Sequence, residues 1–476
     1  MALLNRCGDG VACRLDRGER TVHVEALEGR VLLAADAVLE WNSMALDALR
    51  NSGDHGGPAW ASRNLAIVHA AIFDAVNSVD GSYEPYLVDI DAPRQTNASV
   101  ATAVAAAGVL DALYPHLQST FDAALEKDLA AVPDGVRKAL GVRLGETVAG
   151  KILAARADDG SEDPSSYVPT DEPGHWQPTP GDFSSPVGAN WGGVTPFVVQ
   201  QMSKFTAPPP PALNSADYTA AFDQVKRLGA TNSTERTAEQ TEIATFWAYD
   251  RGVMGTPMVL YNQIAQSIAR QQHNTLVENA RMFALMNLAM GDAGISAWTD
   301  KYLYDFWRPV TAIHQADADG NDATTADPTW SPLGMPGTPS MTPPFPAYIS
   351  GHSTFGAAAF TVLADFYGSD RMQFTVSSDE LPGVTRTFKR FSDAAAENGM
   401  SRIYMGVHWT FDNVEGKKAG GAIGDYVFNH ALQRQRSHDD RGNDVTCPQT
   451  ATHDSPSDTN VFSDLLVSRK ADELWS

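Results

Sequence analysis

Residues 343–352 read PPFPAYISGH, and the chain continues as STFGAAAFTVLADFY to residue 367. Three prolines exclude a regular helix before Ser350, whereas the apolar run from Thr354 to Tyr367 predicts one after it. Ser350-Gly351-His352 therefore opens a helix and brings a hydroxyl, a glycine N–H and an imidazole to its positive end. These groups predict an anion-binding site.

A lysine and an arginine upstream supply positive charge for such a site. Lys301 and Arg308 are seven residues apart, and on a continuous α-helix residues at this spacing return to nearly the same face. The two side chains are therefore predicted to point at one place. Pro309 is expected to end that helix, because proline removes a backbone donor and clashes with the preceding turn.

A third segment, residues 401–412, adds an arginine, a histidine and an aspartate. Arg402 and His408 do not share a helical face, so a break in the chain is expected near Gly406. His408 and Asp412 are one helical turn apart. The carboxylate of Asp412 can accept a proton from one ring nitrogen and leave the other to attack or to ligate.

The order Lys-x6-Arg-Pro, Ser-Gly-His and Ser-Arg-x3-Gly-x-His-x3-Asp resembles the superfamily of type-2 phosphatidic acid phosphatases, bacterial acid phosphatases and vanadium-dependent haloperoxidases. Ile349 departs from the family pattern, which usually has proline before Ser-Gly-His. Residues 246–250, 292–295 and 343–348 are similar to the vanadium chloroperoxidase group in particular. The resemblance extends from about residue 240 to 430, with a weaker echo at 41–42 and 68–77.

The resemblance implies a vanadate cofactor in this site. His408 would bind vanadium, and the oxygens would be held by Lys301, Arg308, Arg402, Ser350 and the Gly351 N–H. Phosphate has the same charge and oxyanion geometry, so it could occupy the same cage.

The resemblance also implies roles for five side chains around the cofactor. His352 would be the acid–base group, Asp412 would orient the vanadium ligand, and Asp250 would pair with the buried arginines. Trp298 and Phe345 match positions that line the halide side of the chloroperoxidase pocket. An aromatic residue rather than a histidine at position 345 favours the chloroperoxidase pattern.

The implied reaction is oxidation of chloride or bromide by hydrogen peroxide to hypohalous acid, with vanadium as a Lewis acid that keeps its oxidation state. The partners would be hydrogen peroxide, halide and small organic acceptors. The same residues allow an alternative, a soluble acid phosphatase in which His408 attacks phosphorus and His352 protonates the leaving alcohol. Both histidines are present, which disfavours a non-enzymatic member of the superfamily.

Composition narrows the remaining classes of function. No apolar run approaches the roughly 20 residues that span a bilayer, so no transmembrane segment is expected. The net charge of −23 disfavours binding to nucleic acid. The cysteines, Cys7, Cys13 and Cys447, lie outside the predicted site and predict neither a disulfide framework nor a thiolate metal site. An oligomer is compatible with the sequence but not predicted by it.

Helical periodicity dominates the chain and predicts an all-α protein of two helical bundles with long Pro-rich connections. The resemblance implies a paired four-helix-bundle architecture. The predicted parts are a leader-like segment at 1–36, an N-terminal bundle with its crossover loop at 37–213, a C-terminal bundle with the oxyanion site at 214–434 and a polar tail at 435–476. Only residues 373–388 predict a short hairpin.

The first of these parts contains the run VEALEGRVLLAAD at residues 24–36. It resembles the Leu-Glu-Pro-Arg-x-Leu-Leu element at the start of large exported bacterial proteins, with Gly29 in place of the proline. This favours a secreted or cell-envelope location. The alternative is a short amphipathic helix that packs on the domain.

Overall fold

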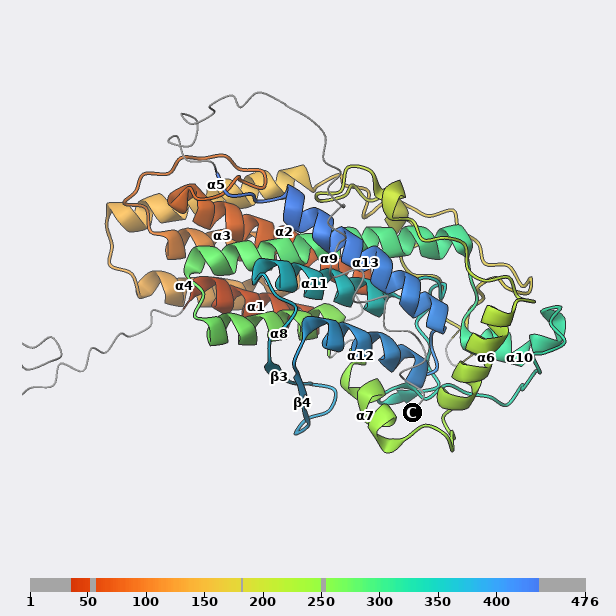
Figure 1. Cartoon of the computed structure of the whole chain (residues 1–476). Helices are drawn as coiled ribbons and strands as arrows, with labels where there is room; N and C mark the ends of the chain where they lie inside the picture. The colour runs from red at the N-terminus through yellow and green to blue at the C-terminus, as the bar shows by residue number, and fades with distance from the viewer. Residues whose placement is uncertain (1–35, 52–56, 181–182, 250–253, 436–476) are drawn as a thin grey trace, which may run out of the picture. The chain divides into compact units, whose positions relative to one another are not determined.

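The computed structural model describes residues 36–51, 57–180, 183–249 and 254–435 (Figure 1). The helices of these segments are α1 (Ala37–Asn51), α2 (Gly57–Asp80), α3 (Ala98–Leu113), α4 (Gln118–Ala130), α5 (Val136–Ala155), α6 (Ala216–Leu228), α7 (Ala238–Phe246), α8 (Pro257–Gln272), α9 (Leu276–Tyr304), α10 (Pro309–His314), α11 (Gly351–Phe366), α12 (Phe391–Tyr404) and α13 (Thr410–His430). Short 3-10 turns are η1 (Pro115–Leu117), η2 (Trp191–Gly193), η3 (Met202–Phe205) and η4 (Ala316–Ala318). The prediction of an all-α protein is confirmed.

Two antiparallel two-stranded sheets accompany the helices. The strands β3 (Phe374–Ser377) and β4 (Thr385–Phe388) pair within the predicted hairpin, which confirms it. The strands β1 (Gly334–Met335) and β2 (Thr338–Pro339) form a second pair. The expectation of a single hairpin is therefore wrong. Strands of two residues are too short to show the alternating pattern by which a sequence reveals a strand.

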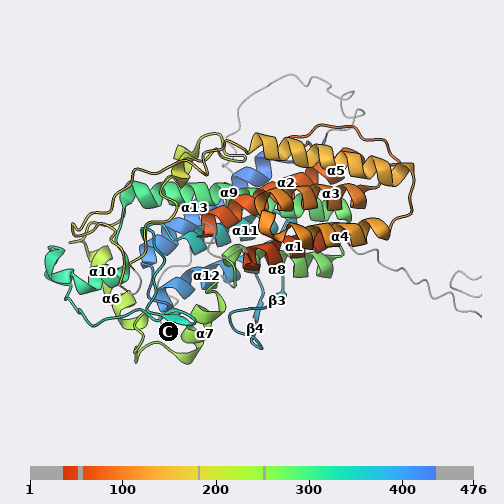
Figure 2. The same cartoon turned by 180° about the vertical axis from the view of Figure 1, so that it is seen from behind.

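Helix α9 is the central element, and it is buried along most of its 29 residues. It packs along α2 on one side and against α11 and α13 on the other (Figures 1 and 2). Helix α3 packs against both α2 and α5. The start of α9 is fixed locally by a capping box in which Thr275 and Glu278 each bond to the other's backbone N–H. A helix that is apolar on nearly all sides is stable only when other helices surround it.

Small residues bring α13 unusually close to α11. A Cβ at Gly420 would lie 2.0 Å from the backbone oxygen of Thr354, and a Cβ at Gly416 would lie 2.9 Å from that of Ser350. Only glycine allows this approach. It places the start of α13 beside the first turn of α11, where two of the three predicted site segments meet.

Two buried aspartates of α9 hold the irregular crossover segment against the helix. Asp292 accepts the N–H groups of residues 197–199 at 2.6 to 2.9 Å, and Asp300 accepts that of Ala207 at 2.9 Å. Burial raises the pKa of Asp292 to about 6 and that of Asp300 to about 7. Loop backbone donors of this kind would otherwise be buried without acceptors.

All described residues belong to one compact unit, and its apolar core includes residues from both predicted bundles. The boundary near residue 213 stays a prediction. The leader-like segment and the polar tail lie almost entirely outside the described residues, so export also stays a prediction. In the described part of the chain, no single helix has both the length and the apolar composition to cross a membrane; α3 and the η1–α4 stretch pass that test only as a bent pair.

Candidate active site

The segment after α9 corrects one sequence prediction. Lys301 lies in the last turn of α9, which ends at Tyr304 because Asp305 takes a left-handed conformation with φ 50°. Arg308 is extended, with φ −78° and ψ 154°, and Pro309 is the first residue of α10. The prediction that Lys301 and Arg308 share one helix ended by Pro309 is therefore wrong. Proline is favourable at the first position of a helix, where its missing N–H costs nothing.

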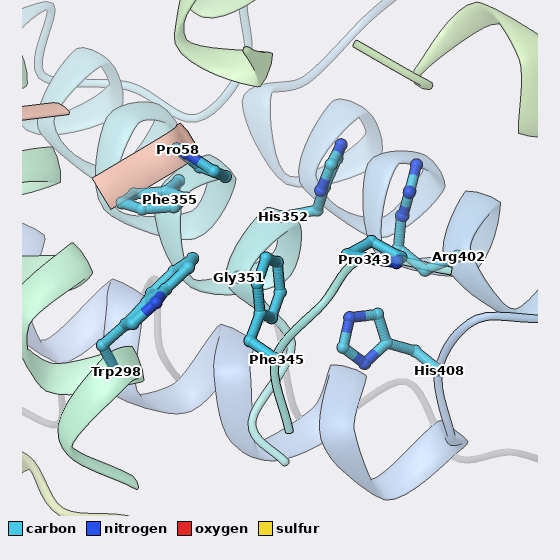
Figure 3. A pocket seen from close by; sticks show the side chains of 9 residues that line it. All are labelled: Pro58, Trp298, Pro343, Phe345, Gly351, His352, Phe355, Arg402 and His408. Atoms are coloured by element: carbon cyan, nitrogen blue, oxygen red, sulfur yellow. The ribbon is translucent and has the colours of Figure 1, made fainter. Parts of the chain in front are cut away.

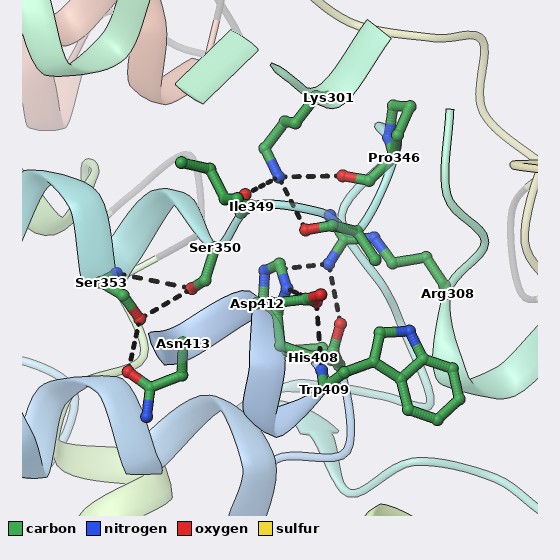
Figure 4. A network of polar contacts seen from close by, with 12 residues as sticks. Lys301, Arg308, Pro346, Ile349, Ser350, Ser353, His408, Trp409, Asp412 and Asn413 are labelled. Carbon is green, nitrogen blue, oxygen red and sulfur yellow. Dashed lines mark hydrogen bonds and ion pairs between the residues drawn. The ribbon is translucent and has the colours of Figure 1, made fainter. Parts of the chain in front are cut away.

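The two cations nevertheless converge on the segment that precedes Ser350. The ammonium of Lys301 donates to the carbonyl oxygens of Pro346, Ala347 and Ile349 at 2.9, 3.1 and 2.6 Å (Figure 4). This side chain is fully buried. Three carbonyl dipoles thus stabilise the charge of the ammonium. The ammonium in turn holds the backbone of residues 346–349 in place.

Arg308 connects the same segment to the third one. Its Nε donates to the carbonyl of Phe345 at 2.8 Å, and its Nη1 donates to the carbonyl of Val407 at 2.8 Å. The guanidinium carbon also lies 4.9 Å from the centre of the Phe345 ring, and Lys301 Nζ lies 5.0 Å from it. Phe345 is therefore held by two cations, each in cation–π distance.

His408 lies just before α13, in the segment that follows the left-handed Gly406 (φ 81°). Its Nδ1 is 2.7 Å from Asp412 Oδ2, which confirms the predicted pair, and its Nε2 is 3.1 Å from Arg308 Nη1. A guanidinium has no lone pair to offer, so Nε2 accepts and the proton lies on Nδ1. Burial, and then the charge of Arg308, lowers the pKa of His408 well below 6.5. The ring is neutral, with its lone pair on Nε2.

Asp412 joins the two helices that meet at the site. Its Oδ2 accepts the Trp409 N–H at 3.1 Å as well as the His408 proton, and its backbone carbonyl accepts the Ser350 N–H at 3.1 Å (Figure 4). Burial raises the pKa of Asp412 to about 7. One residue therefore fixes both the tautomer of His408 and the distance between α13 and α11.

The helix start predicted at Ser350-Gly351-His352 is confirmed. Ser350 is the N-cap of α11, and its side chain accepts the N–H of Ser353. Gly351 occupies the first helical position, whose N–H has no acceptor within the helix. The hydroxyl of Ser353 donates to Asn413 at 3.0 Å, which further holds this turn against α13.

His352 and Arg402 share a partner in the segment after α7. His352 Nε2 donates to the carbonyl of Ala248 at 3.0 Å, and Arg402 Nη1 lies 3.5 Å from the carbonyls of Trp247 and Ala248. Burial and the charge of Arg402 lower the pKa of His352 well below 6.5. The neutral ring therefore carries its proton on Nε2 and its lone pair on Nδ1. Asp250, predicted to pair with the arginines, lies outside the described residues.

A small, narrow cavity lies where these segments meet (Figure 3). The residues that line it are Pro58, Trp298, Pro343, Phe345, Gly351, His352, Phe355, Arg402 and His408. Figure 3 shows Trp298 and Phe355 on one side and Arg402 and His408 on the other. The ring centre of Trp298 is 4.9 Å from that of Phe345 and 6.0 Å from that of Phe355. The cavity thus has an aromatic wall and a polar wall that includes the guanidinium of Arg402.

The structure separates the predicted site residues into two layers. Trp298, Phe345, His352, Arg402 and His408 line the cavity together with Gly351. Lys301 and Arg308 lie behind this lining, in contact with the Phe345 ring, and Ser350 directly precedes Gly351.

Sequence reasoning missed three lining residues. Phe355 is one helical turn beyond Gly351, a spacing that could have identified it. Pro343 belongs to the family-like stretch 343–348 but has no predicted role there, and Pro58 belongs to no motif. Neither carries a polar side-chain group that would mark it as part of a site. The carbonyl of Ala248 was also missed, because a backbone acceptor has no side-chain signature.

The groups around the cavity fit an anion better than a metal cation. Within the described residues, no group of three or more His, Cys, Asp or Glu side chains could hold a metal ion. Arg402 is 1% exposed, and Lys301 and Arg308 are 0% exposed. Burying three cations near one point is costly unless negative charge compensates them.

Comparison with known proteins supports a family assignment. Residues 281–437 match the model of the VCPO second helical-bundle domain. The chain is 30% identical over 484 residues to vanadium chloroperoxidase of Curvularia inaequalis, which covers 79% of this chain and 78% of that protein. Among solved structures, the first bacterial vanadium-dependent iodoperoxidase is 26% identical, with a TM-score of 0.72, and covers 84% of this chain and 97% of its own.

A second solved structure shows the same fold at lower identity. The holo form of a bacterial vanadium-dependent chloroperoxidase is 19% identical, with a TM-score of 0.63 over 80% of this chain and 93% of that chain. The Curvularia inaequalis relative is aligned over more than two thirds of both proteins, and the matched residues 281–437 include all three site segments. This protein therefore belongs to the vanadium chloroperoxidase family.

Proposed function

We propose that this protein is a vanadate-dependent haloperoxidase, which oxidises a halide with hydrogen peroxide to hypohalous acid. The observation that supports this most directly is the tautomer of His408. Its Nδ1 is 2.7 Å from Asp412 Oδ2 and its Nε2 is 3.1 Å from Arg308 Nη1, which assigns the proton to Nδ1 and the lone pair to Nε2. A neutral imidazole oriented by a carboxylate is the usual form of a histidine ligand to a metal.

The cations near this nitrogen suit vanadate, whose oxygens would compete with the carbonyls that accept all three N–H groups of Lys301. His408 Nε2 would bind vanadium, and the oxygens would be held by Lys301, Arg308, Arg402, Ser350 and the Gly351 N–H. When bound, vanadate supplies Lewis-acid activation of hydrogen peroxide towards attack by a halide. The positive charges of the buried cations and the negative charge of the oxyanion would compensate each other.

His352 is the group that can move a proton in this cavity. Its Nε2–H is held by the Ala248 carbonyl, so the ring accepts a proton at Nδ1 without changing its orientation. Burial and Arg402 lower its pKa, and the negative charge of a bound oxyanion would raise it towards the range in which a group can take up a proton and return it. The aromatic wall excludes water from the opposite side, where a halide would lose part of its hydration shell.

We propose chloride or bromide as the halide, because Phe345 gives this wall an aromatic ring. Iodide is the comparison that a test must include, since one solved relative is named an iodoperoxidase. The same His408 lone pair would also serve a phosphatase, with attack on phosphorus at Nε2 and protonation of the leaving alcohol by His352. That is the second candidate function.

One assay separates the two functions. The purified protein, freed of bound anions, is supplied with orthovanadate, hydrogen peroxide and chloride, bromide or iodide, and halogenation of a dye is followed. Phosphatase activity is measured in parallel without vanadate. Vanadate-dependent halogenation supports the haloperoxidase. Phosphate ester hydrolysis without any halogenation would replace it with the phosphatase.

Phosphate is expected to compete with vanadate for the cage. The cations and the helix start recognise charge and oxyanion geometry, which the two anions share. Excess phosphate should therefore lower the apparent affinity for vanadate in calorimetric titrations and slow the recovery of peroxidase activity. Sodium acetate at the same ionic strength controls for screening of charge. Unchanged vanadate affinity in phosphate would contradict a shared site.

Replacing Phe345 by histidine is expected to lower chloride oxidation more than bromide oxidation, with vanadate affinity little changed. Chloride is the harder ion to desolvate and depends more on the apolar wall. In addition, a protonated histidine would lie between Lys301 and Arg308, which now contact the ring face at 5.0 and 4.9 Å. Steady-state rates at matched pH give the chloride-to-bromide ratio. Phe345→Leu keeps an apolar wall and should change this ratio less; equal ratios in all three proteins would remove Phe345 from the halide side.

A further inference from the structure

The crossover segment at residues 183–190 contacts the aromatic wall of the cavity through the backbone carbonyl and N–H of Val187. The carbonyl of Val187 accepts the indole N–H of Trp298 at 3.2 Å and the hydroxyl of Tyr302 at 2.8 Å. The N–H of Val187 donates to the carbonyl of Pro344 at 2.9 Å. Val187 therefore links α9, which carries Trp298, to the segment that carries Phe345.

The next residue leaves no space for a side chain. Gly188 has φ 77°, and a Cβ there would lie 2.5 Å from Nε1 and 2.7 Å from Cδ1 of Trp298. Real Cβ atoms essentially never come this close to another heavy atom, and the backbone conformation itself disfavours other residues. Any residue but glycine would displace the indole or the crossover segment.

The segment is anchored firmly on its far side. The carbonyl of Gly188 accepts the N–H of Trp191 at 2.9 Å. The Trp191 ring is fully buried, with its centre 4.3 Å from that of Trp60 in α2. A bulky group added at position 188 would therefore act on the indole of Trp298 in preference to moving this anchored turn.

The indole itself fills the space between the crossover segment and the start of α11. A Cβ at Gly351 would lie 3.3 Å from the six-membered ring of Trp298, and the whole side chain is 1% exposed. The rings of Phe345 and Phe355 lie beside it, each tilted against the indole (Figure 3). A group that pushes on the pyrrole ring of Trp298 from position 188 would therefore move the part of the cavity wall that the indole forms.

We propose that Val187-Gly188 is a positioning element for the halide side of the cavity, with Gly188 setting halide affinity and choice through the Trp298 indole. This inference rests on the proposed function, because it assigns the aromatic wall to the halide. Val187 and Gly188, which precede Trp298 by more than 100 residues, would then belong to the residues that shape the site.

The test is a double-mutant cycle with Gly188→Ala and Trp298→Phe. Phenylalanine lacks the pyrrole atoms that the new Cβ would meet, so the two changes are expected to be coupled. The control is Gly193→Ala in η2, directly after this segment, where a Cβ meets nothing within 4 Å. For each variant, kcat and KM are measured with chloride, bromide and iodide, together with vanadate affinity and thermal unfolding.

Gly188→Ala is expected to raise the KM for halide by about five- to tenfold and to change the ratio between halides, whereas the same change in the Trp298→Phe background should have less than about a twofold effect. Vanadate affinity should stay nearly constant, and Gly193→Ala should behave like the unchanged protein. A purely structural glycine would instead lower the unfolding temperature equally in both backgrounds and leave KM unaltered. Equal effects of Gly188→Ala in both backgrounds would overturn the proposal, as would a parallel loss of vanadate affinity.

Two further measurements keep the proposal testable if an assay fails. If Gly188→Ala does not fold, Tyr302→Phe removes one of the two donors to the Val187 carbonyl and should raise halide KM in the same direction by a smaller factor; an unchanged KM would overturn the proposal. If the unchanged protein oxidises no halide, the proposed function is wrong. Non-additive unfolding of Gly188→Ala and Trp298→Phe would then still support control of the indole by Gly188, and additive unfolding would overturn it.

Discussion

Replacing His408 by alanine is expected to weaken vanadate binding by about 100-fold or more, because it would remove the proposed bond between the protein and vanadium. Loss of even an outer-sphere partner of a metal ligand often costs about 10- to 100-fold in affinity. The cationic groups remain in this variant. It should therefore bind vanadate and phosphate with similar affinities, since only charge and shape are then recognised. Calorimetric titration with each anion measures both quantities.

The comparison with phosphate makes this experiment specific. A general loss of structure would weaken both anions in parallel, whereas loss of a vanadium ligand weakens vanadate alone. His69 provides a matched control, as a fully buried histidine whose Nε2 contacts Asn42 at 3.1 Å outside the site. His69→Ala should leave the preference for vanadate intact. Retention of that preference in His408→Ala would show that His408 is not the ligand.

The parts of the site that the sequence predicted correctly depend on neighbours along the chain. The helix start at Ser350 follows from a proline-rich approach, a capping side chain and an apolar run, all within a few residues. The His408–Asp412 pair likewise needs only a separation of four residues. Local physical rules are enough in such cases, because few other conformations compete with them.

The wrong prediction, a single helix from Lys301 to Arg308, failed because distant residues decide the turn between them. Asp305 accepts the hydroxyl of Tyr167 at 2.5 Å and contacts His175 Nδ1 at 2.9 Å. Its backbone carbonyl also accepts the N–H of residue 176 at 2.7 Å. These partners come from the crossover segment about 130 residues earlier. Aspartate is one of the few residues besides glycine that tolerate the left-handed conformation, but most aspartates do not adopt it, so the local sequence does not identify this turn.

The same reason explains what the sequence could not show of the cavity. The contacts of Ala248, Val187 and Gly188 are made by backbone atoms or by the absence of a side chain. Their partners, His352 and Trp298, lie more than 100 residues away. Motifs record side chains at fixed spacing and therefore identify the reactive groups. The backbone that orients these groups becomes visible only in the folded chain.

Replacing His352 by alanine is expected to lower kcat for halide oxidation by about 100- to 10,000-fold, the usual contribution of a positioned acid–base group. Vanadate affinity should change little, because the His352 ring contacts the Ala248 carbonyl and the cavity and is not the predicted ligand. Alanine also removes the closer donor of that buried carbonyl and leaves it only Arg402 Nη1 at 3.5 Å, which destabilises the fold by about 1–3 kcal/mol. His352→Gln separates the two effects, since its amide can donate to Ala248 but cannot take up a proton. Thermal unfolding should therefore recover in His352→Gln while kcat stays as low as in His352→Ala. Recovery of turnover in the glutamine variant would mean that His352 supports the structure of the cavity and does not transfer a proton.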